Sequence, residues 1–372
     1  MHILAIDTSC DETSVAVTDG RKVLSNVIYS QVLLHKKWGG VVPSIAKRAH
    51  EERINFVVES ACHPRGGGDP ELLNSIDYIA VTQGPGLAVA LEVGIKKAKE
   101  LAKKYRKKLI AVNHLEGHIY SAFVQNSQGN PKRDFNFPYL ALIISGGHTE
   151  FVIFKNHFEY EIIGQTLDDA AGEALDKAAK LLGLGYPGGP VLERLAKEVR
   201  NKDGHNFPRP MLKSKDLNFS FSGLKTSFYY FLKSNNHVIP VPIRGQAPAG
   251  IQLNGSPIRS GMTKESKYDL RQLASSFQEA VFDTLIKKTE KAIKFTTINQ
   301  LIVVGGVVAN FRLRKLMRDL VKKYNGEVLF PSYKYLTGDN AAMIGIVAGF
   351  KAEKSLFVED VGRLDRIPRM SL

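Results

Sequence analysis

Short apolar segments alternate with polar turns along the first third of the chain. Three such segments follow one another, and their length and residue types predict strands joined by tight turns. A stretch with helical spacing comes next, followed by a strand, a helix and a further strand. The expected strands cover residues 3–6, 13–17, 23–28, 77–81 and 109–112, and the expected helices cover about 45–60 and 87–103.

A similar order of elements recurs further along the chain. The duplication lies in the order of the elements, because the residues themselves do not repeat. Two series of the form βββαβα predict an α/β protein with two similar lobes. The second series comprises strands at 139–144, 150–154, 160–163 and 301–304, with helices that begin near Asp169, Asn310 and Asp339.

The composition suits a folded, two-lobed protein. The chain has 372 residues, of which 44% are hydrophobic, and no apolar run approaches the roughly 18 residues that a membrane span requires. Residues 1–6 enter a strand pattern at once, without the features of a secretory or transit peptide. Cys10 and Cys62 are too few for a disulfide framework and are expected to be reduced thiols. We therefore expect a cytoplasmic protein that does not enter a membrane.

The charge balance favours a polyanionic partner. Lys and Arg total 51 against 37 acidic residues, which gives a net charge of +14. Phosphates that bind such a surface release their counterions, so nucleic acid is a candidate partner. A generally basic, solvated surface explains the same surplus, and charge alone leaves both interpretations open.

Turns that contain glycine or hydroxyl side chains follow three of the predicted strands, at residues 7–9, 145–149 and 305–306. Glycine lets backbone amides approach a phosphate closely, and open α/β sheets bind ligands at the carboxyl ends of their strands. Each turn alone is explained as a plain tight turn. Together they indicate a nucleotide site, although neither the P-loop motif nor the GxGxxG fingerprint is present.

Two histidines four residues apart form a candidate metal site. His114 and His118 fall on one face of a predicted helix, a spacing that lets two imidazoles hold one divalent ion. Ordinary surface or core positions are the alternative for such a pair. A zinc protease carries Glu directly after the first His, but Leu115 holds that place. Glu116 points away from the histidine face at about 100° per residue, which argues against a metalloprotease.

Acidic residues form another candidate feature. Asp169, Glu173 and Asp176 recur at helical spacing and repel one another, and Lys177 offsets only part of that repulsion. A solvated helix side explains the pattern; a bound metal or a hydroxyl-rich or cationic ligand is the other explanation. Asp339 opens the last predicted helix as its expected N-cap, a role that leaves one carboxylate oxygen for a metal.

Seven segments, taken in order, carry a resemblance that spans nearly the whole chain. They cover residues 6–13, 113–118, 145–150, 168–190, 219–226, 305–310 and 339–342. These segments resemble the tRNA N6-adenosine threonylcarbamoyltransferase family, once described as glycoproteases. The sequence Phe-Ser-Phe-Ser-Gly-Leu-Lys-Thr at 219–226 is typical of its bacterial form.

The resemblance implies a fold as well as an activity. The family has the two-lobed ASKHA fold shared with actin, sugar kinases and the seventy-kilodalton chaperones. The first lobe would comprise residues 1–109 plus 339–372, and the second lobe residues 110–338. Residues 239–267, rich in Gly, Pro, Ser and Gln, would form an inserted surface loop. The helices that begin near His114 and Asp339 would then meet at the cleft.

The same resemblance implies the residues of the site. His114, His118 and Asp339 match the ligands of one divalent metal ion, reported as iron or zinc, with iron favoured. Asp11 and Glu12 match acids of the loop that faces the active site, and we treat them as catalytic candidates whose role is open. The positions that match substrate-binding residues are Ile143, Ile144, Ser145, Gly146, Gly147, Asp176, Gly189 and Asn310.

The implied reaction moves a threonylcarbamoyl group from threonylcarbamoyl-adenylate to the exocyclic amine of adenosine 37 and releases AMP. Its acceptors are tRNAs that read codons beginning with A. The implied protein partners are an inactive relative of the same fold and a small ATPase, with a homodimer as the alternative assembly. An ATP-dependent kinase of the same fold and a chaperone-like nucleotide switch are rival functions, and neither requires the histidine pair.

Overall fold

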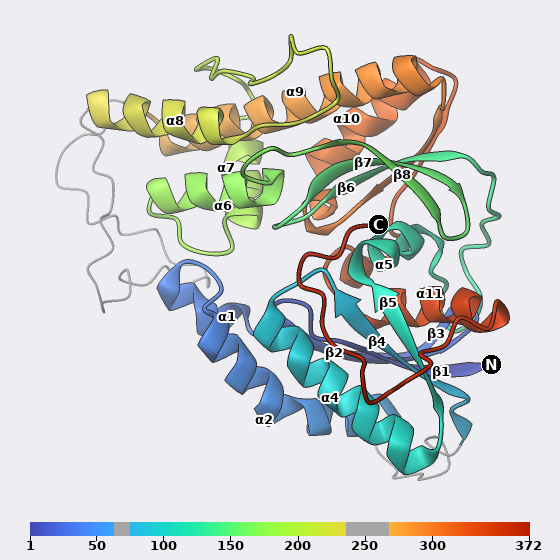
Figure 1. Ribbon diagram of the computed structural model, residues 1–372. Helices are drawn as coiled ribbons and strands as arrows, with labels where there is room; N and C mark the ends of the chain where they lie inside the picture. Colours follow the sequence, from blue (N-terminus) through green and yellow to red (C-terminus); the bar gives the residue numbers. More distant parts are fainter. Residues whose placement is uncertain (63–74, 236–267) are drawn as a thin grey trace.

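The computed structural model describes residues 1–62, 75–235 and 268–372 and contains two five-stranded sheets, one in each half of the molecule (Figure 1). The loop expected at residues 239–267 lies outside the described residues. Among the helices in the described ranges, none has the length and apolar character needed to cross a bilayer.

The first sheet has the strand order β3-β2-β1-β4-β5. Strand β1 pairs antiparallel with β2 and parallel with β4, and almost every residue of β1 and β4 is buried. Strands that are covered on both faces read as continuous apolar runs, which is the pattern seen in the sequence. The bounds are β1 His2–Asp7, β2 Glu12–Asp19, β3 Lys22–Ser30, β4 Tyr78–Gly84 and β5 Lys108–Asn113.

The second sheet repeats this topology with the order β10-β9-β6-β7-β8. Strand β6 pairs antiparallel with β7 and parallel with β9, so it takes the place that β1 has in the first sheet. The predicted duplicated α/β architecture is therefore confirmed. The bounds are β6 Tyr139–Ile144, β7 Thr149–Asn156, β8 Glu159–Gln165, β9 Gln300–Val304 and β10 Glu327–Leu329.

The helices form three layers around the two sheets. Helices α2 and α4 pack on the outer face of the first sheet, α6 to α10 cover the second sheet, and α5 and α11 lie between the sheets (Figure 1). The bounds are α1 Val32–His35, α2 Pro43–Cys62, α4 Ala88–Tyr105, α5 His114–Tyr120, α6 Ala171–Leu181, α7 Gly188–Glu198, α8 Ser222–Ser234, α9 Leu270–Thr296, α10 Phe311–Lys322 and α11 Ala341–Glu353. Short 3₁₀ helices are η1 Lys36–Trp38, η2 Ser121–Phe123, η3 Gly306–Ala309 and η4 Lys334–Leu336.

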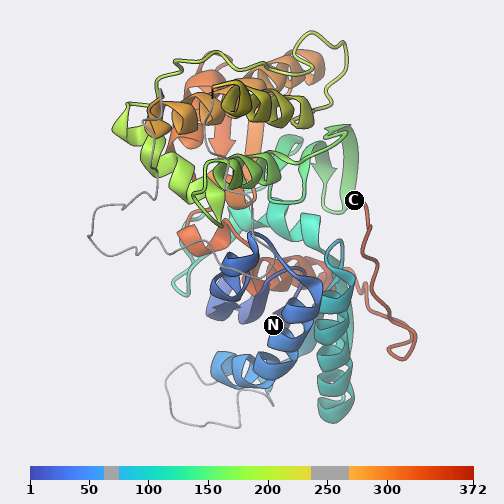
Figure 2. The same cartoon turned by 90° about the vertical axis from the view of Figure 1, so that its left-hand side faces the viewer.

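Helix α11 brings the end of the chain back to the first sheet, where it packs against β1, β2 and β5. Gly345 permits this approach, because a Cβ there would lie 2.7 Å from Thr18 Oγ1. The residues after α11 then run along the first lobe beside α4 (Figure 2), and Asn113 Nδ2 donates a hydrogen bond to Ser371 O at 2.8 Å. The lobe boundaries of 1–109 plus 339–372 and 110–338 stay a prediction.

Candidate active site

The two histidines are placed by the junction between β5 and α5. Strand β5 ends at Asn113, whose side-chain oxygen accepts a hydrogen bond from Leu115 N at 2.8 Å and so caps the helix. His114 is the first residue of α5, and His118 lies one turn later on the same face. Both side chains are buried, as the helical spacing requires once α5 is enclosed between the two sheets.

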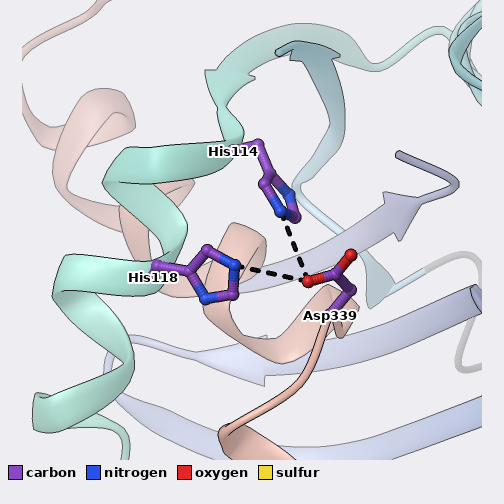
Figure 3. A group of neighbouring side chains, drawn as sticks. All are labelled: His114, His118 and Asp339. Atoms are coloured by element: carbon purple, nitrogen blue, oxygen red, sulfur yellow. Dashed lines mark ion pairs between the residues drawn. The ribbon is translucent and has the colours of Figure 1, made fainter. Parts of the chain in front are cut away.

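Asp339 completes the group from the segment before α11. Its Oδ1 lies 3.4 Å from His114 Nε2 and 3.3 Å from His118 Nε2 (Figure 3). Asn340, and not Asp339, is the N-cap of α11, since its Oδ1 accepts from Met343 N at 3.1 Å. The prediction that Asp339 caps the last helix is therefore wrong, because its carboxylate faces the histidines instead.

These three residues fit a divalent metal ion. One potential ligand atom from each lies within 4.8 Å of the others, and two imidazoles with one carboxylate suit zinc or iron. Within the described part of the chain, neither ring nitrogen of His118 has a hydrogen-bond partner, and His114 Nδ1 and Asp7 Oδ2 also lack one. Because buried polar atoms are normally satisfied and an imidazole binds a metal through one nitrogen, the unpartnered Nε2 of His118 beside Asp339 supports a bound cation.

The electrostatics of the group favour a positive charge among these side chains. Burial opposes a charge on His114, but Asp339 and Asp7 outweigh it and raise the pKa of His114 to about 9. Burial, together with the neighbouring His114, lowers the pKa of His118. Burial also opposes ionisation of Asp339, yet the two histidines hold its pKa well below the usual value. A divalent ion would supply the positive charge that a proton on His114 otherwise provides.

A cavity of about 690 Å³ opens beside this group, a size typical of small-molecule sites. Turns from both sheets line it, as the positions of the glycine-containing turns predict. Eight of the predicted site residues lie on its wall, namely Asp11, Glu12, His114, Ser145, Gly146, Gly147, Asp176 and Asp339.

The glycines of the cavity wall fall into two kinds. A Cβ on Gly146, Gly147 or Gly306 would meet no described atom within 4 Å, so the fold itself does not require glycine there. Gly305, which adjoins the wall, differs because its φ is +99° and its Cβ would lie 2.4 Å from Ile144 O. Gly305 is therefore needed for packing, whereas the other three place no side chain between the backbone and a ligand, and Gly147 N already donates to Ser145 Oγ at 3.3 Å.

The remaining predicted substrate residues do not line the cavity. Ile143 and Ile144 are fully buried within β6. Asn310 caps α10 by accepting from Leu313 N at 3.2 Å and donates to Gln278 Oε1 at 3.0 Å. Gly189 N donates to Asp176 Oδ1 at 3.3 Å. These four residues shape the site through the backbone and neighbouring side chains.

The acidic helix differs from its prediction. Helix α6 begins at Ala171, so Asp169 lies ahead of it, and Lys177 Nζ reaches Asp169 at 2.6 Å and Glu173 at 2.8 Å. Lys225 adds a second contact to Asp169 at 3.0 Å. The expected repulsion without sufficient compensation is therefore wrong, since the charges are paired. Glu173 and Asp176 both line the cavity, and burial raises the pKa of Asp176 although two backbone amides oppose the shift.

Glu116 points away from the histidines, as its place in the helix predicts, and its Oε2 lies 2.9 Å from Lys351 Nζ. The sequence placed Asp7 in a turn of the predicted nucleotide site and did not assign it to the histidine group. Asp7 is fully buried at the end of β1, and its Oδ2 lies 3.9 Å from His114 Nδ1, within ion-pair range but without a hydrogen bond. The sequence feature that could have indicated Asp7 is its place directly after a predicted buried strand.

The cavity wall also includes His148, Lys180 and Tyr186. Burial and the two nearby histidines lower the pKa of His148 to about 4.

Comparison with known proteins places the chain among relatives of one kind. The family model described as tRNA N6-adenosine threonylcarbamoyltransferase matches residues 22–346. The relative of that name from Thermosipho africanus is 42% identical over 372 residues and covers 100% of both chains. Its counterpart from Endomicrobium trichonymphae is 44% identical and covers 95% of this chain and 93% of its own length.

Solved structures of low sequence identity share the fold. HypF of T. kodakarensis gives a TM-score of 0.58 at 15% identity, over 95% of this chain and 48% of its own. An activator of 2-hydroxyisocaproyl-CoA dehydratase from Clostridium difficile gives 0.50 at 12% identity, over 96% and 97% of the two chains. These likenesses agree with the two-lobed ASKHA fold. From the family model and the full-length relatives together, the chain belongs to the tRNA N6-adenosine threonylcarbamoyltransferase family.

Proposed function

We propose that this chain transfers the threonylcarbamoyl group of threonylcarbamoyl-adenylate to the exocyclic amine of adenosine 37 in tRNAs that read codons beginning with A. One observation carries the proposal beyond family membership. A single cavity brings the open glycine turn after β6 together with the buried group formed by His114 and Asp339. The first can receive a phosphate and the second can hold a metal ion beside the reacting carbonyl.

The turn after β6 would hold the adenylate phosphate. Gly146 and Gly147 carry no side chain that could keep an anion away from their backbone amides. Ser145 Oγ accepts from His148 N at 3.0 Å, which fixes the turn before a ligand arrives. Amides held in such a concave turn bind phosphate through hydrogen bonds and partial positive charge.

His114, His118 and Asp339 would hold one divalent ion, and we favour iron or zinc because of the two imidazole ligands. Such an ion, when bound, supplies a Lewis acid for the carbamoyl carbonyl. Asp7 would keep the His114 ring oriented through Nδ1, the usual arrangement of an acid behind a metal-binding histidine.

The transfer requires a group that accepts a proton. The amine nitrogen forms a bond to the carbamoyl carbon, the bond from that carbon to the phosphate oxygen breaks, and AMP leaves with the electron pair. Glu12 lines the cavity, and burial together with the adjacent Asp11 raises its pKa well above the usual value. We assign Glu12 as the acceptor of the amine proton, because it lines the cavity and a raised pKa makes its carboxylate a stronger base.

The proposal also covers the compartment in which the chain acts and its protein partners. A tRNA substrate supports action in the cytoplasm, and the excess of positive charge suits its phosphate backbone. We propose that the chain works with an inactive relative of the same fold and a small ATPase, and that a homodimer is the alternative assembly.

The test is a transfer assay with metal-loaded protein, threonylcarbamoyl-adenylate and unmodified tRNA, with and without the partner proteins. Nucleoside mass spectrometry measures threonylcarbamoyladenosine, and elemental analysis measures bound metal. We expect about one metal ion per chain in the native protein. His114→Ala should lose both the metal and the product.

His2→Ala is the matched control, because His2 lies at the opposite end of β1 from Asp7. This variant should keep the metal and the product. Full activity of metal-free protein, or of His114→Ala, would refute the proposed site. Absence of product in every condition, from folded protein that binds tRNA, would refute the proposed reaction.

A further inference from the structure

The sole tryptophan of the chain stands beside the entrance of the cavity. Trp38 ends the short helix η1, and 50% of its surface is exposed. The next residue, Gly39, has a φ of 67°, a left-handed conformation that turns the chain abruptly. Gly39, Gly40 and Val41 then form part of the cavity wall. A large aromatic ring is therefore displayed in the segment that leads directly into the proposed active site.

The backbone on both sides of Trp38 is anchored. His35 is fully buried, its Nε2 donates to Gln31 Oε1 at 3.1 Å, and its Nδ1 accepts from Val42 N at 3.3 Å. Gln31 N in turn donates to Asp11 O at 2.9 Å, which ties the segment to the turn after β1. Because His35 joins the residues before and after Trp38, the backbone that carries the ring is held in place relative to Asp11.

Positive charges from two elements lie close to the segment of Trp38 and Gly39. Lys37 Nζ lies 5.4 Å from the centroid of the Trp38 ring. Lys180, from α6 of the second sheet's helical layer, reaches across so that its Nζ would lie 3.4 Å from a Cβ on Gly39. Within residues 1–62, 75–235 and 268–372, neither lysine has a carboxylate partner. Two acids of α6 also lie on the cavity wall: Glu173 is paired with Lys177 at 2.8 Å, and Asp176 accepts hydrogen bonds from Gly188 N and Gly189 N.

Such a surface suits an unpaired stretch of RNA. Single-stranded nucleic acid is recognised by aromatic rings that stack on bases and by cations that follow the phosphates. Leu33 and Leu34 precede Trp38 and are also exposed, which a protein partner could use. Lysines are depleted in protein interfaces, however. Two ammonium groups without a carboxylate partner, one beside the ring and one beside Gly39, therefore favour a phosphate-bearing ligand.

We propose that Trp38 stacks on an unpaired base of the RNA loop that carries the target adenosine, while Lys37 and Lys180 contact the flanking phosphates. This inference rests on the proposed function, because it assigns a contact for the tRNA acceptor. It gives the first lobe a part in holding the acceptor loop at the cavity entrance, in addition to Asp339, the one proposed metal ligand within the predicted first lobe.

The native tryptophan allows a direct test, since its fluorescence reports on one position only. The full chain is titrated with unmodified tRNA, with its anticodon stem-loop, and with a fully paired duplex of equal length. Stacking on a base quenches indole emission. We expect quenching by the tRNA and the stem-loop but not by the duplex. Lys37→Gln and Lys180→Gln should each reduce the slope of log affinity against log salt by about 0.7.

Substitutions of Trp38 test whether the proposed stacking contact affects the KM for tRNA. Trp38→Ala should raise the KM for tRNA by about 5- to 150-fold, the range expected for loss of one base stack, with a smaller change in kcat. Trp38→Phe should restore most of the affinity, because a phenyl ring still stacks. Phe295→Ala removes another exposed aromatic ring, at the end of α9, and should leave the KM unchanged.

The outcomes separate this inference from the function on which it rests. Product formation with an unchanged KM in Trp38→Ala, or tRNA binding without quenching, would overturn the inference and leave the proposed function intact. Quenching by a partner protein but not by RNA would overturn it by assigning Trp38 to a protein interface. Absence of tRNA binding and product in the native protein would overturn both.

Discussion

Lys351, near the end of α11, connects the two helices that present the proposed metal ligands. Its Nζ lies 2.9 Å from Glu116 Oε2 and donates a hydrogen bond to Ala111 O at 3.2 Å. Ala111 precedes His114 and Glu116 follows it, so Lys351 spans the junction from which the first histidine projects. Gly117 lets the two helices meet there, because its Cβ would lie 2.9 Å from Ile344 Cδ1.

We predict that Lys351→Met lowers the free energy of unfolding by about 3 kcal/mol. Loss of one partner from a buried ion pair costs about 3–5 kcal/mol, since the remaining charge is left without compensation. The lower end applies because the Lys351 and Glu116 side chains keep 15% and 9% exposure. A shift of α5 against α11 should also weaken metal binding by about tenfold or more, the effect usual for residues that orient metal ligands.

Urea denaturation and competition with a chromophoric chelator measure the two effects. The double variant with Glu116→Gln should recover much of the lost stability, because it leaves no unpaired buried charge. Lys354→Met removes an exposed lysine one residue beyond α11 and should change stability by no more than about 0.5 kcal/mol. A loss below about 1 kcal/mol in Lys351→Met, with native metal affinity, would refute the role that we give to the ion pair.

Three further substitutions test the turns. Gly146→Ala should keep the native melting temperature and raise the KM for the adenylate, because its Cβ has free space in the described structure; a clear loss of stability would contradict this. Gly305→Ala should destabilise the fold by about 1–3 kcal/mol, since its Cβ would lie 2.4 Å from Ile144 O; native stability in denaturation would contradict it. Asp168 accepts four hydrogen bonds from residues 220–222, and these bonds outweigh burial and lower the pKa of its carboxyl. The ionised carboxylate therefore stabilises the folded protein above pH about 4, and this stabilisation is lost as pH falls through the folded pKa. The melting temperatures of native protein and Asp168→Asn should therefore converge in acid, and a gap that does not change with pH would contradict that reasoning.

Local pattern was sufficient for most elements of the fold. The continuous apolar runs at residues 3–6 and 139–144 lie inside β1 and β6, the central strands of the two sheets. The spacing of His114 and His118 placed both on one face of α5, and the same geometry directed Glu116 away from them. These predictions succeeded because they depend on positions within one turn or one strand of each other.

Predictions that depended on distant residues were less successful. Asp169 was read as part of a repulsive helix face, but its partner Lys225 lies 56 residues away and comes close only in the folded chain. Asp339 was read as an N-cap because an acid before a helix usually is one. Asn340 takes that role, and the carboxylate of Asp339 turns to histidines more than 200 residues earlier in the sequence. No local pattern carries such information.

The duplicated topology places two equivalent turns at the proposed site, and their different chemistry sets the orientation of a ligand. The turns after β1 and β6 occupy equivalent places in their sheets, and Asp11 and Gly146, one from each turn, line the same cavity. The first turn is acidic and lies beside the proposed metal ligands, whereas the glycines of the second carry no side chain toward the cavity. A ligand with a phosphate at one end and a carbonyl at the other would therefore bind in one orientation, with its phosphate at the second turn. Two lobes of similar topology can thus support an asymmetric reaction because the residues of their equivalent turns differ.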